Sequence, residues 1–237
     1  TQVNTIYQAG LQPWLVKFTS QSLALGHEES LCETAYLKMA HNAGIEVPEY
    51  QLITPPKNSD AIAWLALRRF DCTNNGRYHL HSLCGLLDAD FRMPSLDYED
   101  LIAFAGMLTR DVREVEKMYQ LAVFNVLAHN RDDHAKNFSF LMDEQGQWAL
   151  SPAYDLTFSS GPRGEQSTMV MGEGKAPTAE HLIKLGIDAK IDKDRIHEII
   201  QQTQVSLAKW PRLAKHHGVS ATNIRLIGNK LMQVVGG

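Results

Sequence analysis

Short apolar runs and one helical stripe of apolar residues mark out the elements of the first seventy residues. Short runs of aromatic, β-branched and aliphatic residues between turn residues predict strands, whereas apolar residues every three or four positions predict a helix. Gly44 follows the helical stripe as a C-cap, and Pro48 prevents the helix from resuming. In order, the predicted elements are a strand at 13–18, a helix at 28–43 and strands at 50–54 and 61–67. This order suggests a small antiparallel sheet with one helix packed against it.

Beyond a polar connection at 72–78, which contains Asn74-Asn75-Gly76, the pattern becomes mainly helical. Asp111 and Glu114 predict a capping box at the start of a long helix, whose apolar stripe ends near residue 128. The other predicted elements are helices at 98–109, 179–185, 193–207 and 221–234, and short strands at 138–142 and 148–151. We therefore predict two parts, a partial small lobe at 1–71 and a helical large lobe at 72–237.

The composition is that of an ordinary folded, soluble protein. Hydrophobic residues make up 44% of the 237 residues, charged residues make up 21%, and the formal net charge is −4 at pH 7. This charge argues against a chain whose main task is to grip nucleic acid. No apolar run suits a membrane span and no signal-peptide layout is visible, so we expect a cytoplasmic protein without membrane contact. Three cysteines lack metal-ligand spacing and are expected to be reduced packing residues: Cys32, Cys72 and Cys84.

Four polar residues suggest phosphoryl transfer from ATP. Asp132 and Asn137 stand five residues apart in the polar loop 129–137, and Asp155 follows the predicted hairpin. An Asp at a helix end can accept the proton of an attacking hydroxyl, whereas an amide oxygen and a second carboxylate suit Mg²⁺. Lys17, on a strand of the small lobe, would point at the α- and β-phosphates. The Asp-x-x-x-x-Asn spacing followed by a distant Asp is the arrangement that protein kinases use.

Two segments around the hairpin resemble signatures of the HipA family of bacterial toxin kinases. Residues 124–127 read F-N-V-L and are followed at 133–139 by D-H-A-K-N-F-S, which is similar to that family's D-G-H-x-K-N motif. Residues 150–156 read L-S-P-A-Y-D-L and resemble its L-x-P-x-Y-D segment. Residues 44–48 and 68–71 match two further landmarks, at the end of the small-lobe helix and at the lobe hinge. The resemblance runs from the first strand to the final helix.

The resemblance implies an α+β, protein-kinase-like fold with two lobes: a truncated, β-containing small lobe and a mainly α-helical large lobe. It implies that Asp132 is the catalytic base and that Lys136 offsets charge on the transferring phosphate. By the same resemblance, the magnesium ligands are Asn137 and Asp155, and the ATP-phosphate lysine is Lys17. The other residues that it places around the nucleotide are Arg68, Arg69 and Phe70, through their backbone, and His134, Ala135, Lys136, Asn137 and Tyr154.

The activity that the resemblance implies is transfer of the ATP γ-phosphate to a Ser or Thr of a protein, with Mg²⁺. The implied biological role is the toxin of a toxin–antitoxin module that arrests growth, as in persistence. Aminoacyl-tRNA synthetases are targets of relatives and are therefore expected as the substrate class. The implied partner is a DNA-binding antitoxin of the HipB type, and DNA would be contacted only through it.

Two departures from the family pattern carry expectations of their own. Asp133 stands where the family usually has Gly, and it adds a negative charge beside the base. No glycine-rich phosphate loop precedes Lys17, since residues 8–13 have the wrong distance from the strand and predict a hairpin turn. We therefore expect that the chain starts inside the kinase fold and transfers phosphate poorly without upstream sequence.

Two alternative functions stay open from the sequence. A small-molecule kinase of the aminoglycoside or choline type uses a similar Asp-x-x-x-x-Asn loop, although the details at 134–137 and 154–155 favour the HipA family. A catalytically inactive nucleotide-binding module is the second alternative, given the missing phosphate loop and Asp133. New phosphosites in a proteome would identify a protein kinase, and nucleotide binding without turnover would identify an inactive module.

Ordinary structural roles compete with several of these assignments. Asp155 alone is more often an N-cap or Asx-turn residue, Lys17 an edge-strand lysine and Glu33 a solvated helix residue instead of the partner of Lys17. His134 is equally suited to hydrogen-bond the loop backbone. Four further assignments are structural: His79 and His81 as surface or strand residues, 209–217 as a solvated basic helix face, and 172–175 as a turn.

Overall fold

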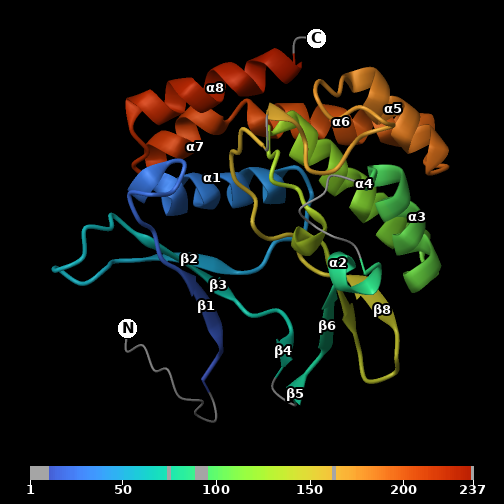
Figure 1. Cartoon of the computed structure of the whole chain (residues 1–237), viewed down its shortest axis with the longest axis horizontal. Helices are drawn as coiled ribbons and strands as arrows, with labels where there is room; N and C mark the ends of the chain where they lie inside the picture. The colour runs from blue at the N-terminus through green and yellow to red at the C-terminus, as the bar shows by residue number, and fades with distance from the viewer. Residues whose placement is uncertain (1–10, 74–75, 89–95, 162–163, 236–237) are drawn as a thin grey trace.

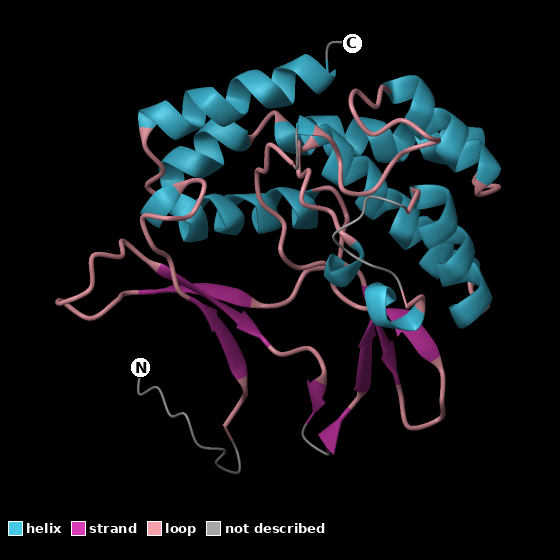
Figure 2. Ribbon diagram, in the orientation of Figure 1, coloured by secondary structure: helices cyan, strands magenta, loops and turns pink. Residues whose placement is uncertain are grey.

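The structure is a computed structural model that describes residues 11–73, 76–88, 96–161 and 164–235. Helices gather on one side of the molecule and three small antiparallel sheets on the other (Figures 1 and 2). The first part of the turn predicted at 8–13 and the pair at 74–75 lie outside the described residues. No helix in the described ranges has both the length and the apolar character needed to cross a membrane.

The first sheet confirms the predicted order of strand, helix, strand and strand. Its strands run antiparallel in the order β1-β3-β2. The predicted connection at 55–58 joins the adjacent strands β2 and β3. Helix α1 packs against β2 and β3, as expected for an amphipathic helix beside a small sheet. The elements are β1 Trp14–Lys17, the 3₁₀ turn η1 Gly26–Glu28, α1 Glu29–Asn42, β2 Tyr50–Ile53 and β3 Trp64–Arg68.

Helix α1 lies between this sheet and the helical part of the molecule (Figure 1). Ten of its fourteen residues are buried, far more than one amphipathic face would bury. Tyr36 donates its hydroxyl to the carbonyl of Ala128 at 2.8 Å, and Ser206 donates to the carbonyl of Met39 at 2.6 Å. The Tyr36 ring also meets the Trp210 ring edge-on at 5.6 Å. The helix therefore joins the two parts into one core.

The connection predicted at 72–78 contains two short paired strands, and this local hairpin was not expected from its polar composition. The next strand, β6, pairs with β7, and β7 pairs with β8, so a second three-stranded sheet leads into the helical part. His79 and His81 lie on β6, which confirms their assignment as strand residues. The elements are β4 Cys72–Thr73, β5 Gly76–Arg77, β6 His79–Ser82, α2 Leu83–Leu86, β7 Ser139–Met142 and β8 Trp148–Leu150.

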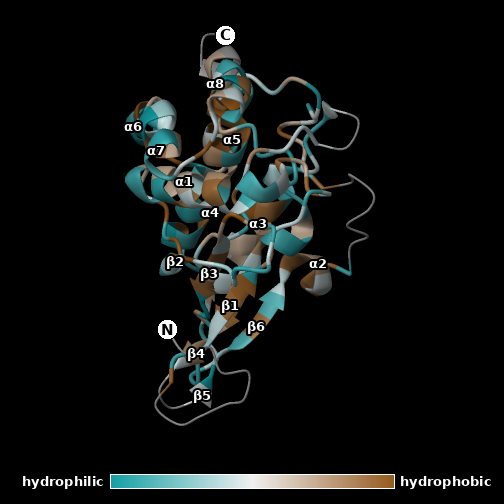
Figure 3. Ribbon diagram, turned by 90° about the vertical axis from the view of Figure 1, so that its left-hand side faces the viewer, coloured by the Kyte–Doolittle hydropathy of each residue, from teal (hydrophilic) through white to brown (hydrophobic). Residues whose placement is uncertain are grey.

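The helical part confirms the predicted helices and adds a short one. Figure 3 shows hydrophilic residues on the outer turns of α6 and hydrophobic residues toward the interior. The added helix, α7, opens with Pro211 in its first turn and exposes Arg212, Lys215 and His216, which confirms a solvated basic face. The elements are α3 Tyr98–Thr109, α4 Val112–Leu127, η2 Ala135–Asn137, α5 Ala179–Asp188, α6 Lys193–Leu207, α7 Trp210–His216 and α8 Ala221–Val235.

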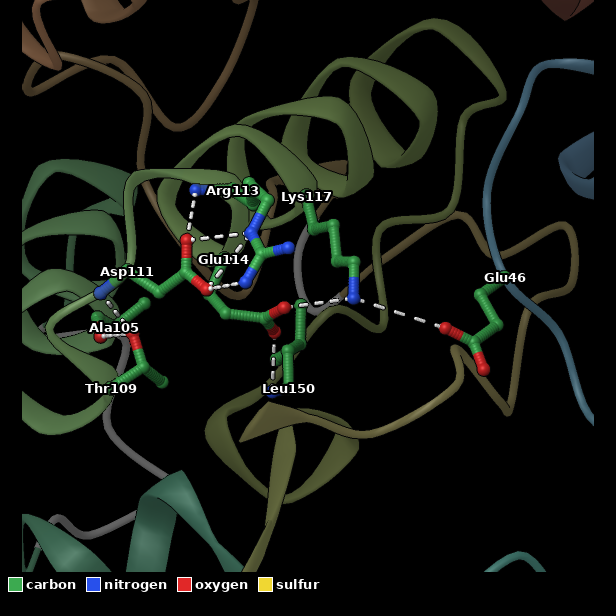
Figure 4. A network of polar contacts seen from close by, with 8 residues as sticks. All are labelled: Glu46, Ala105, Thr109, Asp111, Arg113, Glu114, Lys117 and Leu150. Atoms are coloured by element: carbon green, nitrogen blue, oxygen red, sulfur yellow. Dashed lines mark hydrogen bonds and ion pairs between the residues drawn. The ribbon is translucent and has the colours of Figure 1, made fainter. Parts of the chain in front are cut away.

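The predicted capping box at the start of α4 is half right. Asp111 caps the helix and accepts from the Arg113 amide at 2.9 Å, whereas Glu114 does not return to the cap (Figure 4). The buried Glu114 carboxylate accepts from the Leu150 amide at 2.7 Å and from Lys117 at 2.8 Å. An edge amide of β8 offered a stronger partner, because an unpaired buried N–H is costly. Glu114 therefore fastens the β7–β8 hairpin to α4.

Candidate active site

A lysine at the end of the first strand organises the candidate site. The Lys17 ammonium lies 2.7 and 2.8 Å from the two carboxylate oxygens of Glu33, and it also donates to a carboxylate oxygen of Asp155. Glu33 is 2% exposed on α1, so the solvated alternative for this residue is wrong. The strand β1, the helix α1 and the segment after β8 thus meet at one cation, although Lys17 and Asp155 are far apart in sequence.

The electrostatics of this contact hold Lys17 charged. Burial alone would lower the pKa of the Lys17 ammonium, but the carboxylates of Glu33 and Asp155 outweigh burial and raise it. Burial raises the pKa of Glu33 to about 7, while the nearby ammonium opposes that rise. A buried charge pair of this kind is costly to break, since removal of one partner leaves the other without compensation.

Asp155 has a backbone conformation that is uncommon outside glycine. Its φ is +58°, in the left-handed region, so the surrounding contacts must hold it there. Tyr154, just before it, donates to the carbonyl of Lys136 at 2.8 Å and shares a 2.6 Å hydrogen bond with Ser139. Thr157, just after it, donates to Glu29 of α1 at 3.1 Å. Asp155 is therefore neither an N-cap nor a simple turn residue, and its side chain points to Lys17.

The loop 129–137 presents Asp132 beside Asp155. Asp132 has a 57% exposed side chain, and Asn137 donates to its backbone carbonyl at 2.8 Å. Burial of part of the carboxylate raises the pKa of Asp132, His134 at 3.8 Å lowers it, and the charge of Asp155 raises it further. An accessible carboxylate with a raised pKa is suited to accept a proton.

Asp133 does not add its charge beside Asp132, contrary to the expectation from the sequence. Its side chain is fully buried and accepts hydrogen bonds from Tyr98 at 2.7 Å and from Gln166 at 3.0 Å. It also accepts from the backbone amides of Ser167 at 2.9 Å and Thr168 at 3.2 Å. Asp133 therefore fastens the segment after Asp155 to the loop 129–137, and its departure from Gly has a structural reason.

Two backbone amides of the hinge segment predicted to contact adenine are already hydrogen-bonded within the protein. The amides of Arg68 and Arg69 donate to the carbonyls of Glu49 and Pro13, at 2.8 and 3.0 Å. The Phe70 ring lies 5.8 Å from the Tyr154 ring with a tilt of 31°, so the hinge contacts the segment that carries Asp155. The side chains of Arg68 and Arg69 form ion pairs with neighbouring carboxylates and do not lie in the site.

One exposed apolar residue on the same strand as Lys17 escaped the sequence reasoning. Leu15 stands two residues before Lys17 on β1, so both side chains share one face of the strand. Leu15 is 52% exposed although it is a large apolar residue in a sheet. The alternation of side chains along the predicted strand, counted from Lys17, could have identified Leu15 from the sequence. Of the four loop residues predicted to contact the nucleotide, Ala135 is buried, Lys136 is exposed, and His134 and Asn137 are half-buried.

The oxygen ligands present suit Mg²⁺ better than a softer metal. Within the described ranges, no three His, Cys, Asp or Glu side chains converge as a protein-only metal site. Magnesium usually takes one or two carboxylates and completes its shell with water and phosphate oxygens. The charge of Asp155 contributes to the raised pKa of Asp132, and a divalent cation would relieve that repulsion. The site therefore fits a cation that arrives with phosphate.

The sequence profile of the HipA-like C-terminal domain matches residues 2–210, which is most of the chain. This chain belongs to the HipA-like C-terminal domain family. Among solved structures, HipA of Shewanella oneidensis MR-1, in complex with HipB and operator DNA, is similar with a TM-score of 0.72 at 17% identity. That match covers 94% of this chain and 57% of the other. The proinflammatory kinase CtkA of Helicobacter pylori is similar with a TM-score of 0.59 at 13% identity, over 95% of this chain and 87% of the other.

Two sequence relatives of this HipA-like domain come from Sinorhizobium fredii, and their names are "Putative kinase Y4dM" and "Putative kinase Y4mE". The first is 28% identical over 207 residues and the second 23% identical over 200 residues, which cover 81% and 75% of this chain. The chain spans only 46% of the length of each. Together with the solved structures, these relatives establish a mixed helix and sheet fold of the HipA and CtkA kind and a kinase-like family.

Proposed function

We propose that the chain is the ATP-binding and catalytic part of a HipA-like serine/threonine protein kinase that uses Mg²⁺. The observation that carries the proposal is the Lys17 ammonium held between Glu33 and Asp155. A strand lysine paired with a helix glutamate, beside a metal-binding aspartate, is what a protein kinase needs to place the phosphates of ATP. The exposed Asp132 nearby supplies a base for the attacking hydroxyl.

Each residue has a role in this proposal. Asn137 and Asp155 hold the magnesium ion, which neutralises the phosphates when it is bound. Lys17 binds the α- and β-phosphates, and Asp132 accepts the proton of the substrate hydroxyl. Lys136 offsets charge on the transferring group. The nucleotide contacts come from the backbone of Arg68, Arg69 and Phe70, and from His134, Ala135, Lys136, Asn137 and Tyr154.

The biological part of the proposal is a toxin whose phosphorylation of a protein, in the class of the aminoacyl-tRNA synthetases, arrests growth in the cytoplasm. The similarity to a HipA solved with HipB and operator DNA supports a DNA-binding antitoxin of the HipB type as the partner. In this proposal the domain meets DNA only through that antitoxin. The two parts at 1–71 and 72–237 act as the lobes around the nucleotide.

Magnesium-dependent ATP binding is the direct test of this assignment. We expect Mg²⁺ and ATP together to raise the melting temperature of the wild-type chain, and Asp155→Ala to abolish the magnesium-dependent part of that rise, because the variant lacks a metal ligand. Asp188→Ala removes an exposed carboxylate on α5 and serves as the control. An unchanged magnesium-dependent shift in Asp155→Ala would sink the assignment.

The substrate class needs a separate measurement. Incubation of the full gene product and its Asp132→Asn variant with cell lysate should leave new phosphoserine or phosphothreonine sites only with the wild type. ATP turnover stimulated by a small alcohol, with no new phosphosites, would instead identify a small-molecule kinase. Magnesium-dependent binding without any turnover would identify an inactive nucleotide-binding module.

A further inference from the structure

A cavity of about 380 Å³ opens beside the loop 129–137 and is separate from the contacts of Lys17. Its walls come from the end of α4, the loop itself, residues 160, 164, 166 and 176–178, and α8. None of Lys17, Asp132 and Asp155 lines it. The proposed nucleotide site therefore leaves this cavity without a role.

The lining of the cavity is cationic. Arg131 and Lys230 bring two permanent positive charges to it, and His129 adds an imidazole. No carboxylate is among the described residues that line it. The nearest acidic influences, Glu165 and Asp133, act on Arg131 from outside the lining.

Arg131 and Lys230 act electrostatically on the same third side chain, His129. Burial lowers the pKa of His129, and the charges of Arg131 and Lys230 lower it further. The His129 ring is fixed in place, since its Nδ1 lies 3.1 Å from the Ser159 carbonyl and its face stacks on Phe158 at 5.3 Å. An anion between Arg131 and Lys230 would relieve the repulsion that these groups now share.

Neutral hydrogen-bonding groups also line the cavity. Ser160, which is exposed, and Thr178 line it, and the Thr178 hydroxyl is hydrogen-bonded to His181. A guanidinium, an ammonium and hydroxyls at one place are the donors that recognise phosphate oxygens in proteins. The volume also exceeds what a single phosphate group needs, so a phosphate attached to a larger group fits as well.

Arg131 connects the cavity to Asp132, its neighbour in the chain. The Arg131 guanidinium donates to the carbonyl of Gly164 and, at 3.2 Å, to the carbonyl of Lys175. The Arg131 carbonyl accepts from the amide and the hydroxyl of Ser167, at 3.2 and 2.9 Å. A ligand on this guanidinium would thus act on both ends of residues 164–175 and on the loop that carries Asp132.

We propose that this cavity is a second anion site, which binds a phosphate group between Arg131 and Lys230 and thereby orders residues 164–175 against the loop 129–137. The phosphate has two possible sources, Ser160 itself after modification or a diffusible phosphate compound. In the first case the Ser160 oxygen attacks the γ-phosphorus of ATP, ADP leaves, and the hydroxyl proton passes to a base. That source alone rests on the proposed kinase function, whereas binding of free phosphate does not.

Titration of the purified chain with inorganic phosphate, followed by calorimetry without nucleotide, tests the site. We expect saturable binding that Lys230→Gln weakens about tenfold, because one of two cations is lost. Arg225→Gln removes the same charge from an exposed position on the same helix and should change the affinity less than about twofold. Absence of saturable binding to protein whose Ser160 is unmodified, or equal affinities for the two variants, overturns the proposal.

Two further measurements separate this site from the nucleotide site and identify the source. The Lys17→Met variant should keep phosphate binding, and its loss would place the phosphate at the nucleotide site instead. Phosphate should slow amide hydrogen exchange at Ser167 and Thr168, and unchanged exchange contradicts the ordering. Mass spectrometry that finds phosphorylated Ser160, in protein that no longer binds free phosphate, assigns the source to the chain. Binding that persists in protein with unmodified Ser160 assigns a diffusible one.

Discussion

Asp132 and Asp133 are neighbours in the chain but lie in opposite environments. Asp132 is largely exposed beside Asp155, whereas Asp133 is fully buried and accepts four hydrogen bonds. The exposed carboxylate is free to meet a substrate, and the buried one is committed to holding the segment after Asp155. The two residues therefore call for different tests.

Replacement of the exposed carboxylate should affect turnover alone. Asp132→Asn keeps the size of the side chain but cannot accept a proton, so we expect kcat to fall by about 10²–10⁴-fold with ATP affinity nearly intact. Steady-state kinetics and nucleotide titration on the full gene product measure the two effects. Asp188→Asn, on the surface of α5, is the matched control. Comparable losses of binding and rate would make Asp132 a metal ligand or a structural residue.

The buried carboxylate should give a characteristic pH dependence of stability. Burial raises the pKa of Asp133 to about 6, although the hydrogen bonds from Tyr98 and from the amides of Thr168 and Ser167 lower it. The folded chain then keeps this proton up to about pH 6, whereas the unfolded chain releases it near the ordinary value of 3.8. Ionisation of Asp133 therefore costs stability as the pH rises between these values.

Comparison with Asp133→Asn isolates this contribution, because the variant has no proton to release there. The free energy of unfolding of the wild type, minus that of the variant, should fall by about 1.4 kcal/mol per pH unit between about pH 4 and 6 and level off above. Urea denaturation at a series of pH values measures the difference. A difference independent of pH would show that Asp133 ionises normally.

Sequence reasoning placed Lys17, Asp132 and Asp155 on the strand, loop and post-hairpin segment where the structure has them, because those positions follow from local periodicity and spacing. It could not decide whether Glu33 and Asp133 are buried or exposed. An acidic residue is exposed by default, whereas tertiary contacts bury Glu33 on α1 and place it beside Lys17 of β1. The partners of Asp133 include Tyr98 and Thr168, each about 35 residues away along the chain, so no local pattern reveals them.

One side chain of α4 attaches the β7–β8 hairpin to the helical part. Glu114 accepts from the Leu150 amide, and Lys117 pairs with Glu114 and lies 3.9 Å from Glu46 (Figure 4). This hairpin leads directly to Asp155, so its attachment also sets the position of that carboxylate. The sequence spacing suggested a capping role for Glu114. In the structure its carboxylate instead accepts from the Leu150 amide.

Loss of the Glu114 carboxylate should lower the free energy of unfolding of the chain. Glu114→Ala leaves the Leu150 amide buried without a partner, so we expect a loss of about 1–3 kcal/mol in the free energy of unfolding. Glu116→Ala, two residues on, breaks only a partly exposed pair with Arg195 and should cost less than about 1 kcal/mol. Denaturant unfolding of both variants gives the comparison. Equal losses would mean that the hairpin is held by other contacts.

Helix α1 makes the two sides of the molecule depend on each other. Its residues pack against the first sheet, against α6 and against α7, and its hydroxyl and carbonyl groups bond across the same boundary. Most buried apolar residues form one continuous cluster that runs through both sides. The two parts predicted on either side of residue 71 therefore share one core.

One cooperative unfolding transition should follow from this shared core. Calorimetry should give a single endotherm whose calorimetric and van't Hoff enthalpies agree. Tyr36→Phe removes the bond to the Ala128 carbonyl and should lower the midpoint of that one transition without splitting it, at a cost of about 1 kcal/mol. Two resolved endotherms in the wild type would contradict a shared core.

The burial of α1 also limits how this protein can be regulated. Kinases that are switched by repositioning the helix with the paired glutamate need a place for that helix to move. Here such a movement would uncover Tyr36 and Met39, both fully buried, and break bonds to the helical part. A helix-out rearrangement would therefore cost this buried packing and the hydrogen bonds that α1 makes with the helical part. In the proposed kinase, regulation is therefore expected to act on the approach of nucleotide or substrate while the Lys17–Glu33 pair stays formed.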